Sequence, residues 1–241
     1  MAAAGRGRQV RDQLTSVTRQ LRPGIGTRWG ILGHSQGGHA ALFTVSLAST
    51  RAPELDLIGA VALAPAGGAR DMVAGLRDIR TPALGFLAFV LIGAAAADQA
   101  VRLDQILSPA GLRLLTRAET SGIDDLIVPG SPPMTAAEVL RTGIDLGPLL
   151  RVLAANDPAA LQPRRPTLIV QGDDDPIVAR SSTDHIARSL HASGAMLDYH
   201  RYCDRGHYDL IAAAHTKNAQ WIETRLAAMP GRPPVSPVDE K

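Results

Sequence analysis

The sequence predicts an α/β fold, in which helices cover both faces of a mostly parallel sheet that carries a helical insertion. Short apolar segments alternate with segments of helical periodicity along the chain. The first three apolar segments are almost continuously hydrophobic, as strands are when both faces of a parallel sheet are covered. Residues 70–160 show helical patterns without a clear strand. Because a structureless loop of that length is rare in a compact domain, this stretch is predicted to be a helical cap.

The elements before the insertion are expected in the order helix, strand, helix, strand. Apolar residues at three- and four-residue steps predict a first helix over 8–21, which a Pro-Gly pair ends. The short apolar run 29–32 predicts a strand. Residues 37–49 are rich in Ala and Leu and predict a helix, and the apolar run 57–63 predicts the second strand.

The elements after the insertion repeat this alternation. The apolar run 167–171 predicts a strand, and a helix is expected over 178–192. Residues 196–202 alternate apolar and polar side chains, as a strand near a sheet edge does, and a final helix is expected over 208–228. The predicted domains are an α/β core of 1–69 and 161–229, a cap or lid insertion of 70–160, and a disordered Pro-rich tail of 230–241.

Composition excludes several classes of protein. The net charge is +2, the pI is about 9.0 and the arginines are scattered, so a nucleic-acid partner is not expected. Cys203 is the one cysteine, so no disulfide framework can form. The uncharged run 81–97 falls short of a membrane span and is expected to be a buried or lipid-facing cap helix. The residues that follow Met1 lack the apolar stretch of a secretory signal peptide, so the sequence leaves the localisation unknown.

The strongest motif is Gly33-His34-Ser35-Gln36-Gly37, a G-x-S-x-G pentapeptide between a predicted strand and a predicted helix. That context is the one a nucleophile elbow requires, with the serine on a sharp turn above the sheet edge. The flanking glycines are expected to avoid clashes between strand and helix. The backbone N–H of Gln36 is expected to stabilise an oxyanion. The alternative is a tight strand-helix turn without chemical significance.

The acid of the site is predicted in Gly172-Asp173-Asp174-Asp175, directly after a strand. A G-x-x-D spacing selects Asp175, and Asp173 is the second choice. A carboxylate there would hold the tautomer of a histidine and stabilise its imidazolium. The alternative is an Asx-rich turn that caps the next helix.

The histidine is predicted to be His207, which lies in a loop after the last strand. The chain has seven histidines. His34 and His39 flank the serine and are expected to pack against the elbow, and the other four fall within predicted helices or strands. Ser35, Asp175 and His207 then follow one another in the order that a nucleophile-elbow fold demands. No metal or cofactor is expected, because no metal-ligand spacing or dinucleotide fingerprint competes.

With these motifs the sequence resembles the secretory lipases, the lipase-A-like branch of the α/β-hydrolases. The resemblance rests on residues 33–41, on residues 52–60, and on the loops that carry the predicted acid and histidine. It implies an α/β-hydrolase fold and hydrolysis of carboxylic esters, often acylglycerols, usually outside the cell. The expected partner is an ester or lipid substrate, which the apolar cap favours over a charged one, and the cap itself is expected to contact a lipid surface.

The sequence departs from this family before the elbow, where only 34 residues precede Ser35. The early strands and the loop that donates a second oxyanion N–H are therefore expected to be missing. An exposed apolar sheet edge would then favour self-association, and activity is expected to be weak. Two alternatives remain open: a serine peptidase or amidase of the same fold, and a truncated inactive domain that binds an apolar ligand or a partner.

Overall fold

A computed structural model of the chain describes residues 27–68, 84–121 and 136–228. The predicted helix 8–21 and the predicted tail 230–241 lie outside these residues. The chain divides into two compact units. The described residues of the first, called the sheet unit, lie in 27–67 and 158–228, and those of the second, called the helical unit, lie in 68–157.

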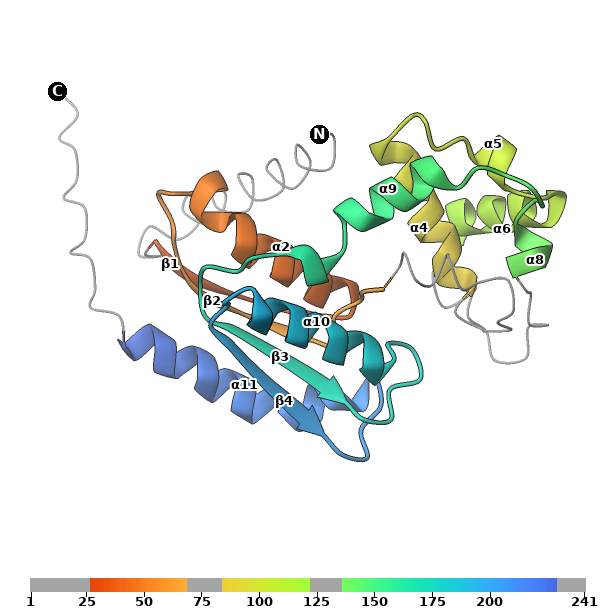
Figure 1. Ribbon diagram of the computed structural model, residues 1–241. Coiled ribbons are helices and arrows are strands. Elements are labelled where there is room, and N and C mark those ends of the chain that lie inside the picture. Colours follow the sequence, from red (N-terminus) through yellow and green to blue (C-terminus); the bar gives the residue numbers. More distant parts are fainter. Residues whose placement is uncertain (1–26, 69–83, 122–135, 229–241) are drawn as a thin grey trace, which may run out of the picture. The chain divides into compact units, whose positions relative to one another are not determined.

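The sheet unit contains four strands that pair side by side in the order of the sequence, all parallel (Figure 1). The central strands are buried at almost every residue because helices cover both of their faces. The outer strands alternate between more and less exposed residues. The strands are β1 (Arg28–His34), β2 (Asp56–Leu63), β3 (Thr167–Gly172) and β4 (Leu197–Tyr202).

Among the described residues, three helices cover the sheet: α2 (Gln36–Arg51), α10 (Arg180–Ala192) and α11 (Asp209–Ala228). Figure 1 shows α2 and α10 on one face and α11 on the other. The alternation of side chains along each strand explains this arrangement. On β3, Ile169 packs in the cluster of α2 and α10, whereas its neighbours Leu168 and Val170 pack in the cluster of α11.

The sheet unit confirms the predicted elements to within two residues at either end. The differences of two residues are the start of α10, which begins at Arg180 rather than at residue 178, and the ends of β1 and α2, which lie at His34 and Arg51 rather than at residues 32 and 49. The sequence did not predict the short 3-10 helix Pro158–Ala160, which precedes β3.

The helical unit packs its helices around an apolar core that includes Leu87, Leu91 and Leu149. Its α4 corresponds to the apolar run 81–97 and carries no charged residue. In the described stretches no helix is long and apolar enough to cross a membrane. The helices are α4 (Leu84–Ala97), α5 (Leu103–Ile106), α6 (Pro109–Thr120), α8 (Ala136–Val139) and α9 (Gly147–Ala155).

Candidate active site

Ser35 lies at the junction of β1 and α2, where the backbone turns sharply. Its φ of 57° and ψ of −118° place it outside the regions that L-residues favour. The surrounding backbone holds it there. The N–H of Ser35 donates to the carbonyl of Leu63 at 2.9 Å, and its own carbonyl accepts from Ala66 at 3.1 Å and from His39 at 3.0 Å. The end of β2 therefore fixes a strained serine of the kind found at functional sites.

The glycines of the motif have unequal roles, which corrects the expectation that both flanking glycines avoid clashes. A Cβ on Gly33 would lie 2.0 Å from the carbonyl oxygen of Gly37. A Cβ on Gly37 itself would meet nothing within 4 Å. The second crowded position is Gly38, where a Cβ would lie 2.8 Å from the carbonyl oxygen of Leu63. The close approach of strand and helix therefore requires glycine at 33 and 38.

Asp175 lies in the loop after β3, and its carboxylate is buried. One oxygen, Oδ1, accepts the backbone N–H groups of Ile177 and Val178, both at 2.8 Å. The other, Oδ2, accepts Nδ1–H of His207 at 2.7 Å. The same carboxylate therefore closes a turn and holds the histidine, but it does not cap the next helix as the alternative expected, because the N-cap of α10 is Ala179.

The pKa of Asp175 lies below its usual value. Burial opposes ionisation, but the hydrogen bond from His207 and the two backbone N–H donors of Val178 and Ile177 outweigh it. The carboxylate is therefore ionised at neutral pH, and His207 has an acceptor for the proton on Nδ1.

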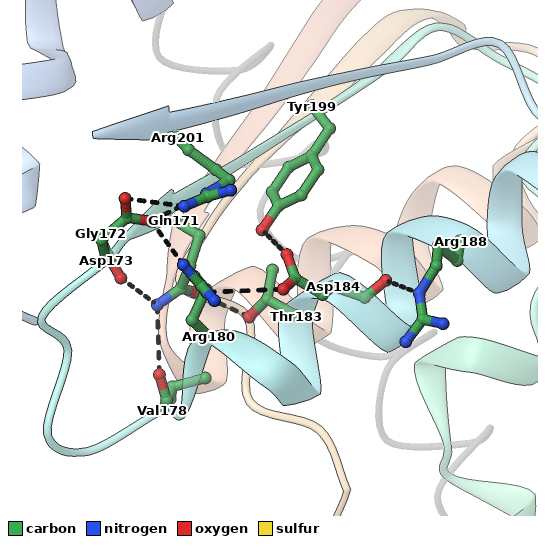
Figure 2. A network of polar contacts seen from close by, with 10 residues as sticks. All are labelled: Gln171, Gly172, Asp173, Val178, Arg180, Thr183, Asp184, Arg188, Tyr199 and Arg201. Atoms are coloured by element: carbon green, nitrogen blue, oxygen red, sulfur yellow. Dashed lines mark hydrogen bonds and ion pairs between the residues drawn. The ribbon is translucent and has the colours of Figure 1, made fainter. Parts of the chain in front are cut away.

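Asp173, the second choice for the acid, pairs with arginines instead of a histidine (Figure 2). Its two oxygens accept Nε–H and Nη2–H of Arg201, both at 2.8 Å, and Arg180 lies 3.9 Å away. The hydrogen bond from Arg201 is the largest cause of its lowered pKa. The side chain of Asp174 is exposed. Of these three consecutive aspartates, Asp175 alone contacts His207.

Sequence reasoning missed Gln171, the last polar side chain of β3 before the acid loop. It is fully buried, and its Nε2 donates to Asp175 Oδ2 at 3.3 Å, while its Oε1 accepts the hydroxyl of Thr183 at 2.7 Å. Figure 2 shows this side chain reaching toward α10. The signal in the sequence was a glutamine at the end of an otherwise apolar strand.

His207 lies in the loop between β4 and α11 and is 4% exposed. Its backbone carbonyl accepts Nε2–H of His34 at 2.9 Å, and the two rings lie 4.4 Å apart. Burial, and then the neighbouring His207, lower the pKa of His34, so His34 is neutral at neutral pH. The expectation that His34 only packs against the elbow missed this link. His39 stacks on Phe43 at 4.7 Å.

The structure thus joins Asp175 and His207 directly and ties Ser35 to them through its neighbour His34. In the described part of the chain, the Ser35 hydroxyl makes no hydrogen bond to the His207 ring. Gln36 is the first residue of α2, so its backbone N–H belongs to the helix N-terminus. No three His, Cys, Asp or Glu side chains gather into a candidate metal site within residues 27–68, 84–121 and 136–228.

Comparisons with known proteins bear on the family of the chain. A family model described as Secretory lipase matches residues 8–235. A Mycobacterium tuberculosis protein named "Probable inactive lipase" is 25% identical over 229 residues, which are 93% of this chain and 51% of that protein. The chain therefore spans about half the length of that curated relative.

Solved structures share the fold. Lipase A of Candida antarctica superposes with a TM-score of 0.74 at 21% identity, over 89% of this chain and 52% of that one. A rice cell wall degrading esterase of Xanthomonas oryzae gives a TM-score of 0.66 at 16% identity, over 87% and 60%. The fold is therefore that of the α/β-hydrolases, as the sequence predicted. With a family model that covers nearly its whole length, this chain belongs to the secretory lipase family.

Proposed function

We propose that this chain is a serine carboxylic-ester hydrolase of the lipase and esterase type, with Ser35, Asp175 and His207 as its catalytic triad. The observation that carries the proposal is the buried 2.7 Å hydrogen bond between Asp175 and His207. The loop of His207 is in turn hydrogen-bonded to His34, the residue before the strained Ser35. A buried carboxylate-imidazole pair beside a serine on a strained turn is the arrangement that activates a serine nucleophile.

The geometry defines a role for each group. Because Nδ1 of His207 donates to Asp175, Nε2 is the nitrogen that can take the proton of the Ser35 hydroxyl. Oγ of Ser35 then attacks the ester carbonyl, and the backbone N–H of Gln36 stabilises the tetrahedral oxyanion. His207 returns the proton to the leaving alcohol, and water releases the acyl group by the same steps. The mechanism requires no metal or cofactor.

An acyl or lipid ester is the proposed substrate class. The relatives' names support it, because they describe a lipase and an esterase. The helical unit adds the uncharged helix α4, with Phe89 among its exposed residues. We propose that this unit is the cap predicted for residues 70–160 and that it contacts a lipid surface.

The test is the variant Ser35→Ala, with Ser181→Ala as matched control because Ser181 is an exposed serine on α10. Hydrolysis of a p-nitrophenyl ester is expected to fall by ~10³-fold or more in Ser35→Ala and to stay unchanged in the control. A fluorophosphonate probe, located by mass spectrometry, is expected on Ser35. Near wild-type hydrolysis by Ser35→Ala, with an unchanged circular dichroism spectrum, would refute the assignment.

The second candidate function is an inactive domain that binds an apolar ligand. The name of the Mycobacterium tuberculosis relative favours it. It predicts that the wild-type chain binds an apolar fluorescent ligand but neither labels with fluorophosphonate nor turns over ester. A p-nitroanilide with the same acyl group separates a third reading, a peptidase or amidase, which would cleave the amide at least as well as the ester.

A further inference from the structure

The carboxylate of Asp175 receives a fourth hydrogen bond from a residue that the triad does not include. Two backbone N–H groups occupy Oδ1, and His207 occupies one site on Oδ2. Gln171 Nε2 donates to the second site on Oδ2 at 3.3 Å. An ionised carboxylate offers about four acceptor sites, so all of them are filled. Rotation of this carboxylate would break at least one of these bonds.

The orientation of the Gln171 amide is itself determined by its surroundings. Its two Nε2–H groups face three acceptors, because the backbone carbonyls of Gly172 at 3.0 Å and Val178 at 3.1 Å lie beside Asp175 Oδ2, so one hydrogen is shared between two of them. Its Oε1 faces the hydroxyl of Thr183, which donates at 2.7 Å. A flipped amide would place an oxygen against three acceptors, which is unfavourable in a buried site. These three acceptors therefore fix the orientation in which the amide donates to Asp175, and the Thr183 hydroxyl donates to the amide oxygen on the other side.

Both side chains are fully buried, and they come from different elements. Gln171 is the penultimate residue of β3, whereas Thr183 lies in the first turn of α10, which packs against the same strand (Figure 2). Neither is ionisable, so neither adds a charge to the site. Since buried polar groups are costly unless paired, a hydroxyl and an amide at these two positions need a reason beyond filling space.

We propose that Thr183 and Gln171 are positioning residues for the catalytic acid. Thr183 anchors the oxygen of the Gln171 amide, the amide nitrogen holds Oδ2 of Asp175, and Asp175 holds the imidazole of His207. The chain of contacts begins on a helix outside the three catalytic loops. This inference rests on the proposed function, because it assigns its effect to the acid of the triad.

The decisive variant is Thr183→Val, which keeps the shape of the side chain and removes the hydroxyl. Its matched control is Thr183→Ser, which keeps the hydroxyl. We expect kcat for a p-nitrophenyl ester to fall about tenfold in Thr183→Val, with KM within about twofold, as for an interaction made mainly in the transition state. Thr183→Ser should remain within about twofold of wild type. Gln171→Leu should lose more, on the order of ~10²-fold in kcat.

These rates are measured well below the melting temperature of every variant, so that partial unfolding does not mimic the effect. If Thr183→Val is destabilised but keeps wild-type kcat, the pair only supports the loop and the proposal is wrong. Equal losses of kcat in Thr183→Val and Thr183→Ser would overturn it as well.

A second measurement does not depend on turnover. In protein labelled with ¹⁵N-histidine, the Nδ1–H proton of His207 should give a downfield NMR resonance because it donates to a buried carboxylate. Thr183→Val should shift this resonance or speed its exchange with water, and Thr183→Ser should not. A chain that shows this pattern without ester hydrolysis would refute the proposed function but support the positioning role. An unchanged resonance in Thr183→Val would refute the role.

Discussion

The crowding at Gly33 predicts a large and specific loss of stability in Gly33→Ala. The added Cβ would lie 2.0 Å from the carbonyl oxygen and 2.2 Å from the carbonyl carbon of Gly37. These atoms belong to the first turn of α2, so no side chain can rotate away, and the helix must move by more than ~1 Å relative to β1. Gly37→Ala is the matched control, because a Cβ there meets nothing within 4 Å.

The expected cost follows from the nature of the obstacle. Overpacking a core typically costs about 1–3 kcal/mol, and a backbone obstacle belongs at the upper end of that range. For a chain of this size, about 3 kcal/mol lowers the melting temperature by roughly 6–12 °C. Gly37→Ala should change stability by less than about 1 kcal/mol and in the stabilising direction, since alanine is the better helix former.

Thermal and urea unfolding followed by circular dichroism measure the difference between these two variants. A free energy of unfolding for Gly33→Ala within about 1 kcal/mol of the wild-type value would contradict this prediction. Equal destabilisation of Gly37→Ala and Gly33→Ala would contradict it as well, because the two glycines would then share one role.

Three further predictions concern the site and the sheet edge. Asp175→Asn should lower kcat by up to ~10⁴-fold, as loss of the acid does in serine proteases, whereas Asp173→Asn should cost far less because its carboxylate pairs with arginine. Because the folded-state pKa of His34 is lowered, the contribution of this residue to the free energy of unfolding is fully present above pH 6.5 and is lost as the pH falls through that folded-state pKa. In urea titrations at several pH values, His34→Phe should flatten this decline. We also propose that the β1 edge supports self-association, since Leu32 is 52% exposed there; Leu32→Glu should reduce dimer formation in light scattering, and unchanged dimer content would refute the proposal.

Sequence reasoning reached the elbow and the acid-histidine pair because each is encoded locally. The G-x-S-x-G spacing between an apolar run and a helical pattern marks a turn whose glycine at 33 the structure requires. The G-x-x-D spacing selected Asp175 over Asp173, and the structure places only Asp175 against His207. These predictions needed only the position of a residue relative to the end of a strand.

The contacts that sequence reasoning missed join residues far apart in the chain. His34 bonds a carbonyl 173 positions away, which no local pattern reports. Gln171 is a polar residue in an apolar strand, a signal that the sequence analysis did not use, and its contact with Thr183 depends on the rotation of α10 against the sheet. The late start of α10 has a related cause, since Asp175 holds the N–H groups of Ile177 and Val178 in a turn.

The two halves of the candidate site depend on different strands, which has a consequence for variants. Ser35 is held by β1 and by the Leu63 carbonyl of β2, whereas Asp175 and His207 are held by the loops after β3 and β4. The ends of β2 and β3 are joined by the hydrogen bond from Ala64 N–H to the Val170 carbonyl at 2.7 Å. The position of one half of the site relative to the other is therefore set in part by a backbone hydrogen bond between β3 and the residue after β2.

His34 supplies a side-chain link between these halves, because its ring holds the carbonyl of His207 while its own backbone leads directly into Ser35. A variant without this link should leave the Asp175–His207 hydrogen bond formed but let the serine and the imidazole move relative to each other. Small misplacements of reacting groups reduce rate far more than they reduce stability. His34→Phe should therefore slow fluorophosphonate labelling of Ser35 while the downfield Nδ1–H resonance of His207 persists, and loss of that resonance would show that the two halves form as one.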